Sequence, residues 1–257
     1  KKDPAAFREA VKPYEVAAEN APQTTIEEDA LMMVAESHYF ADEYAAASQA
    51  YDLLIKRYPR TRYLDQIDQR RFAISQYWIN LAKSGSVTSL FPNFTDKQRP
   101  TTDTFGFATK NLDKIRFDNP TGKLADDATL AAAIAHFEKK KWGQADVLFT
   151  DIRENFPSSE HQFQAHLLGL KCKQELYRGP DYAGGMLDEA EKIIRQIYAQ
   201  FPDQAAEQDA LLQAAYKDVR LKKAEREYAM ARYYDSRAEF GAARLYYDGI
   251  KRQYKDT

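Results

Sequence analysis

Five segments of this chain share one pattern of small and large apolar residues, and this pattern restricts the possible fold more than any other feature. Each segment ends in a proline or in a residue at the equivalent position. Alanine stands twelve residues before that position in all five segments: Ala47, Ala108, Ala145, Ala190 and Ala243. Large apolar residues follow the alanine four and seven positions later, which is the spacing of one helix face. The pattern predicts five copies of one helix that packs closely against a neighbour at its alanine.

Each of these helices should be preceded by a partner helix, and the partner in the fourth unit reads only roughly, from Phe163 to Tyr177. Segments 34–40, 72–78, 132–138 and 230–236 each carry a small residue in the second position, and aromatic or imidazole rings follow three to five positions later. The repeating unit is therefore helix A, a short turn and helix B, which is the tetratricopeptide (TPR) pattern of about 34 residues. The chain keeps the small-residue positions and the closing proline of that pattern, but not its tryptophan and glycine.

These units predict an all-α, TPR-like superhelix of about five helix-turn-helix repeats, forming one domain over residues 1–257. A lead-in over residues 1–25 comes first, with a helix near Ala5–Val11. The repeats are expected near residues 26–61, 62–121, 122–159, 160–204 and 205–257. A loop over residues 84–103 separates the two helices of the second repeat and has no helical period. Loops of this length inside a compact array are commonly functional or disordered.

The charge and the cysteine content exclude several classes of protein. Lysine and arginine number 37 and aspartate and glutamate 39, so the net charge is −2 and no basic field favours nucleic acid. The lone cysteine, Cys172, excludes an internal disulfide and a cysteine-based zinc site. No apolar run reaches the length of a membrane-spanning helix.

Sequence motifs for catalysis and cofactor binding are missing. There is no glycine-rich phosphate loop, no Gly-x-Ser-x-Gly and no His-Glu-x-x-His. His38 and His136 occupy one repeat position, which Tyr234 fills in the last repeat, so packing explains these imidazoles better than metal binding. We expect a protein without catalytic activity, cofactor or metal.

Aromatic residues gather late in successive A helices, the helices that line the concave groove of a TPR array. Some of these rings must pack inside, because each helix has to bury one side, and others are expected in the groove. Together with nearby arginines they suit a peptide with aromatic side chains and a carboxylate. The peptide-groove candidates are Tyr39, Phe40, Arg62, Arg70, Arg71, Tyr77, Trp78 and Phe137.

The last repeat resembles that of a known family. The run Tyr-x-x-Ala-x-Tyr-Tyr-x-x-Arg falls without gaps on Tyr228, Ala231, Tyr233, Tyr234 and Arg237. This run is similar to the last repeat of the BamD (YfiO) family, the TPR lipoproteins of the machinery that assembles β-barrel proteins in the bacterial outer membrane. The first repeat, from residue 39 to residue 61, also looks like the family's first repeat, and the chain has the features of a divergent member.

The resemblance implies a non-catalytic periplasmic scaffold, held to the outer membrane by a lipidated cysteine upstream of Lys1. It implies that the N-terminal repeats recognise segments of unfolded barrel proteins. It also implies that the C-terminal repeats dock the periplasmic domains of the barrel-forming subunit. On this basis the partner-docking candidates are Arg226, Arg232, Arg237 and Tyr246. The alternative is another TPR adaptor of the cell envelope, serving cell division, peptidoglycan association or pilus biogenesis.

Overall fold

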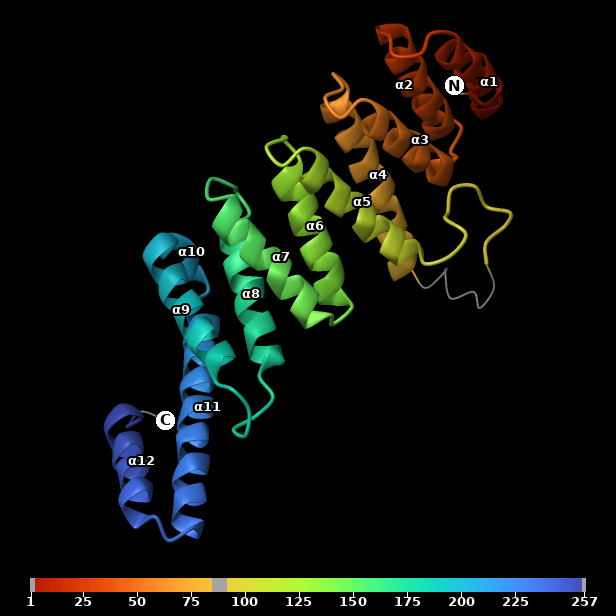
Figure 1. The fold of residues 1–257 in the computed structure, drawn as a ribbon. Helices are drawn as coiled ribbons and strands as arrows, with labels where there is room; N and C mark the ends of the chain where they lie inside the picture. Colours follow the sequence, from red (N-terminus) through yellow and green to blue (C-terminus); the bar gives the residue numbers. More distant parts are fainter. Residues whose placement is uncertain (1–2, 85–91, 256–257) are drawn as a thin grey trace. The chain divides into compact units, whose positions relative to one another are not determined.

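The computed structural model describes residues 3–84 and 92–255, and residues 85–91 of the predicted loop lie outside the described residues. The described residues form α-helices and the turns that connect them, with no β-strand among them (Figure 1). The helices are α1 (Pro4–Asn20), α2 (Thr25–Phe40), α3 (Tyr44–Arg57), α4 (Leu64–Lys83), α5 (Thr104–Asp118), α6 (Ala125–Glu138), α7 (Trp142–Asn155), α8 (Gln162–Leu176), α9 (Gly185–Gln200), α10 (Pro202–Glu207), α11 (Asp209–Ser236) and α12 (Phe240–Gln253). The predicted all-α class and TPR-like repeat fold are confirmed.

The chain divides into two compact units, Lys1–Ala135 and His136–Thr257. Within them, consecutive helices pair as antiparallel hairpins: α2 with α3, α4 with α5, α8 with α9 and α11 with α12 (Figure 1). The first helix of each hairpin is the predicted helix A and the second is helix B. The single domain predicted over residues 1–257 stays a prediction.

The five alanines predicted from the repeat lie on the buried faces of the B helices. All five alanines are buried, in α3, α5, α7, α9 and α12. The large residues four and seven positions later are also buried in the first four B helices, for example Tyr51 and Leu54 in α3. In α12 the equivalent Tyr247 and Ile250 are half-buried. The repeat register read from the sequence is therefore the packing register of the fold.

The B helices all end in the same way. In each of them, the backbone N–H of the residue before the proline position donates to the carbonyl oxygen four residues earlier. The five bonds are Tyr58 to Leu54 at 2.7 Å, Asn119 to Ile115 at 3.1 Å, Phe156 to Ile152 at 3.2 Å, Phe201 to Ile197 at 3.0 Å and Tyr254 to Ile250 at 2.9 Å. The proline that follows in four of the five repeats has no N–H to donate, so it stops the helix there.

The turn from helix A to helix B recurs in three repeats. Asp42, Lys140 and Ala238 stand at the same place and adopt positive φ values of 60°, 56° and 60°. In each turn the next residue donates its N–H to the carbonyl of the residue five positions earlier, which is His38, His136 or Tyr234. The shared position of the two histidines therefore marks the point where helix A turns into helix B.

Two segments differ from the sequence prediction. The lead-in forms a full helix, α1, rather than a short one near Ala5–Val11, because Asp3 caps its first turn and Phe7 packs on Phe40 with ring centroids 5.2 Å apart. The last helix A, α11, has 28 residues. No glycine or proline interrupts the sequence from Asp203 to Phe240, so nothing local stops this helix earlier.

Candidate functional site

Three grooves are lined by A helices. The first groove, of about 370 Å³, is lined by α1, α2 and α4. The second groove, of about 280 Å³, lies between α4 and α6. The third groove, of about 750 Å³, lies between α8 and α11. Apolar grooves between packed helices are common sites for peptides and other ligands, so the A helices carry the candidate binding surface, as the repeat predicts.

The first groove has an apolar floor and an acidic rim. Phe7, Met32, Met33 and Phe40 supply the floor, and Asp29, Glu36 and Tyr63 lie beside it. Methionine side chains adapt to ligands of different shape, so this floor can accept aromatic or aliphatic side chains. Sequence reasoning found Phe40 here but missed the two methionines, whose position about two helical turns before Tyr39 and Phe40 on α2 was the available signal.

Glu36 joins three helices beside the first groove. Its carboxylate accepts from Arg70 Nε and Nη2 of α4 at 2.9 and 2.8 Å, and from the hydroxyl of Tyr51 of α3 at 2.5 Å. Burial acts to raise the pKa of Glu36, but the hydrogen bonds from Arg70 and Tyr51 outweigh it and lower the pKa. The guanidinium of Arg70 also lies over the rings of Tyr39 and Phe40, at 4.6 and 5.0 Å from their centroids. Because the carboxylate of Glu36 and the rings of Tyr39 and Phe40 already contact its guanidinium, Arg70 is poorly placed to bind a ligand's carboxylate.

Arg62 is arranged differently. It pairs with Asp29 and donates to the hydroxyl of Tyr63 at 3.0 Å, at the rim of the first groove. Its side chain is 56% exposed and that of Asp29 is 47% exposed. Exposed pairs contribute about 0–1 kcal/mol, so Arg62 can exchange Asp29 for another carboxylate at little cost. Of the three predicted arginines, Arg62 is the one that a ligand can reach.

Two predicted groove residues lie inside the fold instead. Trp78 is fully buried, and Arg71 is 1% exposed. Arg71 Nη2 lies 2.8 Å from Asp52 Oδ1 and its Nη1 lies 2.6 Å from Asp118 Oδ2. The groove was predicted for Trp78 because it lies late in a helix A and for Arg71 because it lies near the predicted rings, but Arg71 ties α4 to both α3 and α5. Neither side chain can contact a groove ligand in this structure.

A segment of the predicted loop explains the burial of Trp78. We call residues 92–103 the strap. The indole Nε1–H of Trp78 donates to the carbonyl oxygen of Gln98 at 2.7 Å, and the hydroxyl of Tyr77 donates to Gln98 Oε1 at 2.7 Å. Tyr77 is half-buried as a result. The sequence indicated that the loop was important, but no pattern in it pointed to Gln98.

The second groove lies within the first unit. Phe72, Ile79, Leu130 and Ile134 supply its apolar walls, and the carboxamides of Gln76 and Asn80 line it one turn apart on α4, together with Lys83 and Asp127. Phe137, the last predicted groove residue, belongs to the second unit. Its ring packs edge-on against Trp142 at 5.0 Å and Phe149 at 6.2 Å, so its contacts are those of a core residue.

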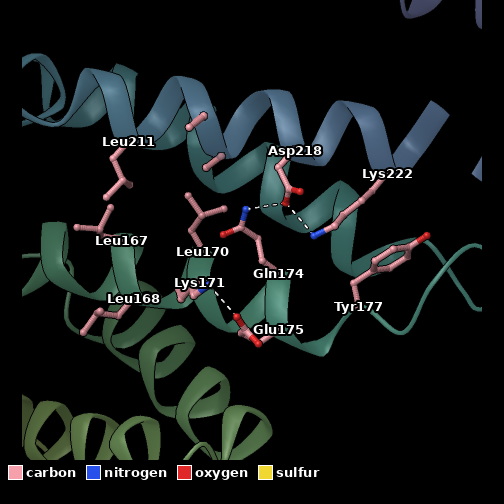
Figure 2. A pocket seen from close by; sticks show the side chains of 12 residues that line it. Leu167, Leu168, Leu170, Lys171, Gln174, Glu175, Tyr177, Leu211, Asp218 and Lys222 are labelled. Atoms are coloured by element: carbon pink, nitrogen blue, oxygen red, sulfur yellow. Dashed lines mark hydrogen bonds and ion pairs between the residues drawn. The ribbon is translucent and has the colours of Figure 1, made fainter. Parts of the chain in front are cut away.

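The third groove has an apolar end and a polar end (Figure 2). Leu167 and Leu211 face each other at the apolar end. At the polar end, Asp218 Oδ2 accepts from Gln174 Nε2 at 3.1 Å and from Lys222 Nζ at 2.8 Å. The leucine end is therefore the part of this groove that suits an apolar side chain of a ligand. Sequence reasoning missed this groove, since leucines on a helix do not by themselves distinguish core from groove.

The predicted docking candidates lie on α11 and α12. Arg226 donates to the carbonyl of Tyr182 at 3.0 Å, and Arg237 lies over the ring of Tyr233, 5.1 Å from its centroid. Tyr246 stacks on Tyr234 at 5.5 Å, and Arg232 is exposed. Around them the hairpin exposes large apolar side chains: Tyr228, Tyr233, Phe240 and Leu245. Exposed aromatic and aliphatic groups at this density are typical of protein-binding surfaces.

The single thiol does not form a reactive site. Cys172 is fully buried, and burial raises its pKa to about 12. A thiol with so high a pKa is neutral and a weak nucleophile. Its neighbour Lys173 pairs with Asp146 at 2.8 Å instead of activating the sulfur.

The helices and their pairing define the class of the chain as an all-helical, TPR-like repeat protein. Comparison with known proteins agrees with this class: the family model of the outer membrane lipoprotein YfiO matches residues 95–257. The chain belongs to this family of outer membrane lipoproteins. A search of curated proteins finds no match. Among the helices that the structure describes, none combines the length and the apolar character needed to cross a membrane.

Proposed function

We propose that the chain is a non-catalytic scaffold for the assembly of outer-membrane β-barrel proteins, acting at the periplasmic face of the outer membrane. It holds segments of unfolded barrel proteins and docks on the periplasmic domains of the barrel-forming subunit. The observation that carries this proposal is the first groove, where an apolar floor of Phe7, Met32, Met33 and Phe40 lies beside the exchangeable Arg62. The family membership supports the cellular setting.

The first groove fits the chemistry of a barrel segment. Its volume of about 370 Å³ accommodates one or two aromatic side chains, and each buried side chain contributes roughly 1.5–3 kcal/mol. The costs of association remove much of this gain, so the affinity is expected to be weak to moderate. A scaffold that passes its client onward needs such an affinity, and Arg62 adds selectivity for a carboxylate.

The hairpin of α11 and α12 is the proposed dock for the barrel-forming subunit. Its helices bury few of their own residues: Ala243 is the buried residue of α12, while Phe240 and Leu245 are 66% and 67% exposed. Arg232 and Arg237 stand among these apolar groups. Arginine and aromatic residues at the centre of an interface commonly dominate the binding energy.

Capture of partners from solubilised envelopes of the source bacterium tests both parts. With the full chain as bait, recovery of the barrel-forming subunit supports the proposal. Phe240→Ala combined with Leu245→Ala should abolish that recovery, and Leu53→Ala, an exposed leucine of α3, is the matched control. Recovery of cell-division, peptidoglycan-associated or pilus components without the barrel subunit would favour the other envelope adaptors and reject the assembly role.

A further inference from the structure

The strap forms an ion pair and two hydrogen bonds with three side chains of the first unit: Glu43, Tyr77 and Trp78. Lys97 Nζ lies 2.8 Å from Glu43 Oε1, and the neighbouring Gln98 satisfies Tyr77 and Trp78 through its side chain and its carbonyl. Glu43 lies at the start of α3, and Tyr77 and Trp78 lie on α4. Two consecutive residues of the strap thus provide a cation, a main-chain acceptor and a carboxamide acceptor to three groups of the helical scaffold.

Glu43, Tyr77 and Trp78 also contact other side chains of the first unit. Glu43 is 7% exposed and also accepts from Arg8 Nε at 2.8 Å and faces His38 Nδ1 at 2.9 Å. Tyr77 is held edge-on by Tyr44 at 5.2 Å, and Trp78 packs against Phe107 at 6.5 Å. The carboxylate, the phenol and the indole thus each have a neighbour outside the strap that holds them in place.

The strap is also folded on its own. The carboxamide of Asn93 donates to the carbonyls of Asp96 and Arg99 at 2.7 and 3.2 Å, and its Oδ1 accepts from the N–H of Asp96 at 3.0 Å. Arg99 pairs with Asp96 at 2.8 Å. The side chain of Lys97 is 65% exposed. These bonds lie within the strap, so they do not depend on its contacts with the helices.

We propose that Glu43, Tyr77 and Trp78 form a peptide-binding site that the chain's own Lys97-Gln98 step occupies as an exchangeable internal ligand. The external ligand is a protein segment with a basic side chain followed by asparagine or glutamine, which can supply the same cation and the same two acceptors. Because the strap is tethered, its effective concentration is in the millimolar range. An external segment therefore binds well when the strap is weakened or when neighbouring contacts add affinity.

The first test asks whether the strap leaves the site. The chain has two tryptophans, so Trp142→Phe leaves Trp78 as the sole indole reporter in the full chain. In this background Lys97→Glu places a second carboxylate against Glu43, and Trp78 emission should shift to longer wavelength as water reaches the indole. Lys110→Glu makes the same charge change at an exposed position of α5 and should leave the emission unchanged. Unaltered emission in the Lys97→Glu chain would overturn the proposal.

The second test asks whether the vacated site binds a separate segment. The probe is a synthetic peptide of residues 92–103, added to the Lys97→Glu chain. It should bind and return Trp78 emission towards shorter wavelength, while the same peptide with glutamate at the lysine position should bind about tenfold more weakly. Tyr77→Phe in the chain should weaken binding about fivefold, the effect of one neutral hydrogen bond. Equal binding of the two peptides, or no binding of either, would show that the strap is a fixed part of the fold.

Discussion

Glu43 Oε1 lies 2.8 Å from both Arg8 Nε of α1 and Lys97 Nζ of the strap. One carboxylate at the start of α3 therefore holds two segments that lie on either side of it in the sequence. Burial acts to raise the pKa of Glu43, but the hydrogen bonds from Lys97, His38 and Arg8 lower it to about 2. The ionised form of Glu43 therefore stabilises the first unit through these contacts.

Acid should weaken the first unit through Glu43. Its folded pKa lies below the ordinary value of 4.5, so its contribution is complete above about pH 5 and is lost as the pH falls from 4.5 towards 2. Glu43→Gln should lower the free energy of unfolding by about 2 kcal/mol at pH 7. The difference from the wild type should shrink towards pH 2. Urea unfolding at several pH values measures both effects, with the exposed Glu19→Gln as control; a pH-independent difference would contradict the assignment.

Asp68 should act in the opposite sense. It is buried, its Oδ2 accepts from Asn119 at 2.9 Å, and burial raises its pKa to about 6. A carboxyl group with a raised folded pKa costs stability as the pH rises from about 4 to above 6. Asp68→Asn should therefore stabilise the chain at pH 8 and have little effect at pH 4, measured by thermal unfolding at the two pH values. Destabilisation at pH 8 would show that the charged form is needed by Arg71.

The turn at Ala238 should be improved by glycine. Ala238 has φ of 60°, a conformation that costs a residue with a Cβ roughly 1 kcal/mol and glycine nothing. Ala238→Gly should slow hydrogen exchange of the α12 amides about fivefold. The comparison variant is Ala229→Gly, inside α11. It should speed hydrogen exchange of the same amides by a similar factor, because glycine destabilises a helix interior by about 0.5–1 kcal/mol. Faster exchange in the Ala238→Gly chain would contradict the strained turn.

Arg62 should select peptides with a free carboxylate. The probe is a ten-residue peptide with aromatic residues at alternate positions, prepared with a C-terminal carboxylate and with a C-terminal amide. Arg62→Ala should weaken binding of the carboxylate form about tenfold, since charged hydrogen bonds contribute about 1.5–3 kcal/mol, and leave the amide form unchanged. Calorimetry measures the binding of both peptides. The control is Arg60→Ala, which removes an exposed arginine nearby. Equal losses for both peptides would mean that Arg62 shapes the groove without binding the carboxylate.

The repeat register could be predicted from sequence because packing imposes it locally. An alanine at the closest approach and large residues one and two turns later are requirements of each helix pair, so Ala47, Tyr51 and Leu54 reveal the fold without any long-range information. The end of helix B at Tyr58 is equally local, since the following proline removes a donor.

The site was harder to predict because it depends on which groups meet across the fold. Arg62, Arg70 and Arg71 look alike in sequence, but their exposure differs because different carboxylates reach them. The strap is a second example. Nothing in the neighbourhood of Gln98 indicates that its carbonyl meets the indole of Trp78, twenty residues earlier in the chain.

The bidentate pair of Glu36 with Arg70 connects the first repeat to the second, because Glu36 lies on α2 and Arg70 on α4. In a linear array each repeat contacts only the adjacent repeats, so a terminal repeat can unfold by itself. Here opening of the first repeat breaks Glu36 away from α4 and leaves the guanidinium of Arg70 without its carboxylate. The first two repeats should consequently melt as one cooperative block, so the smallest stable fragment at this end of the array contains both.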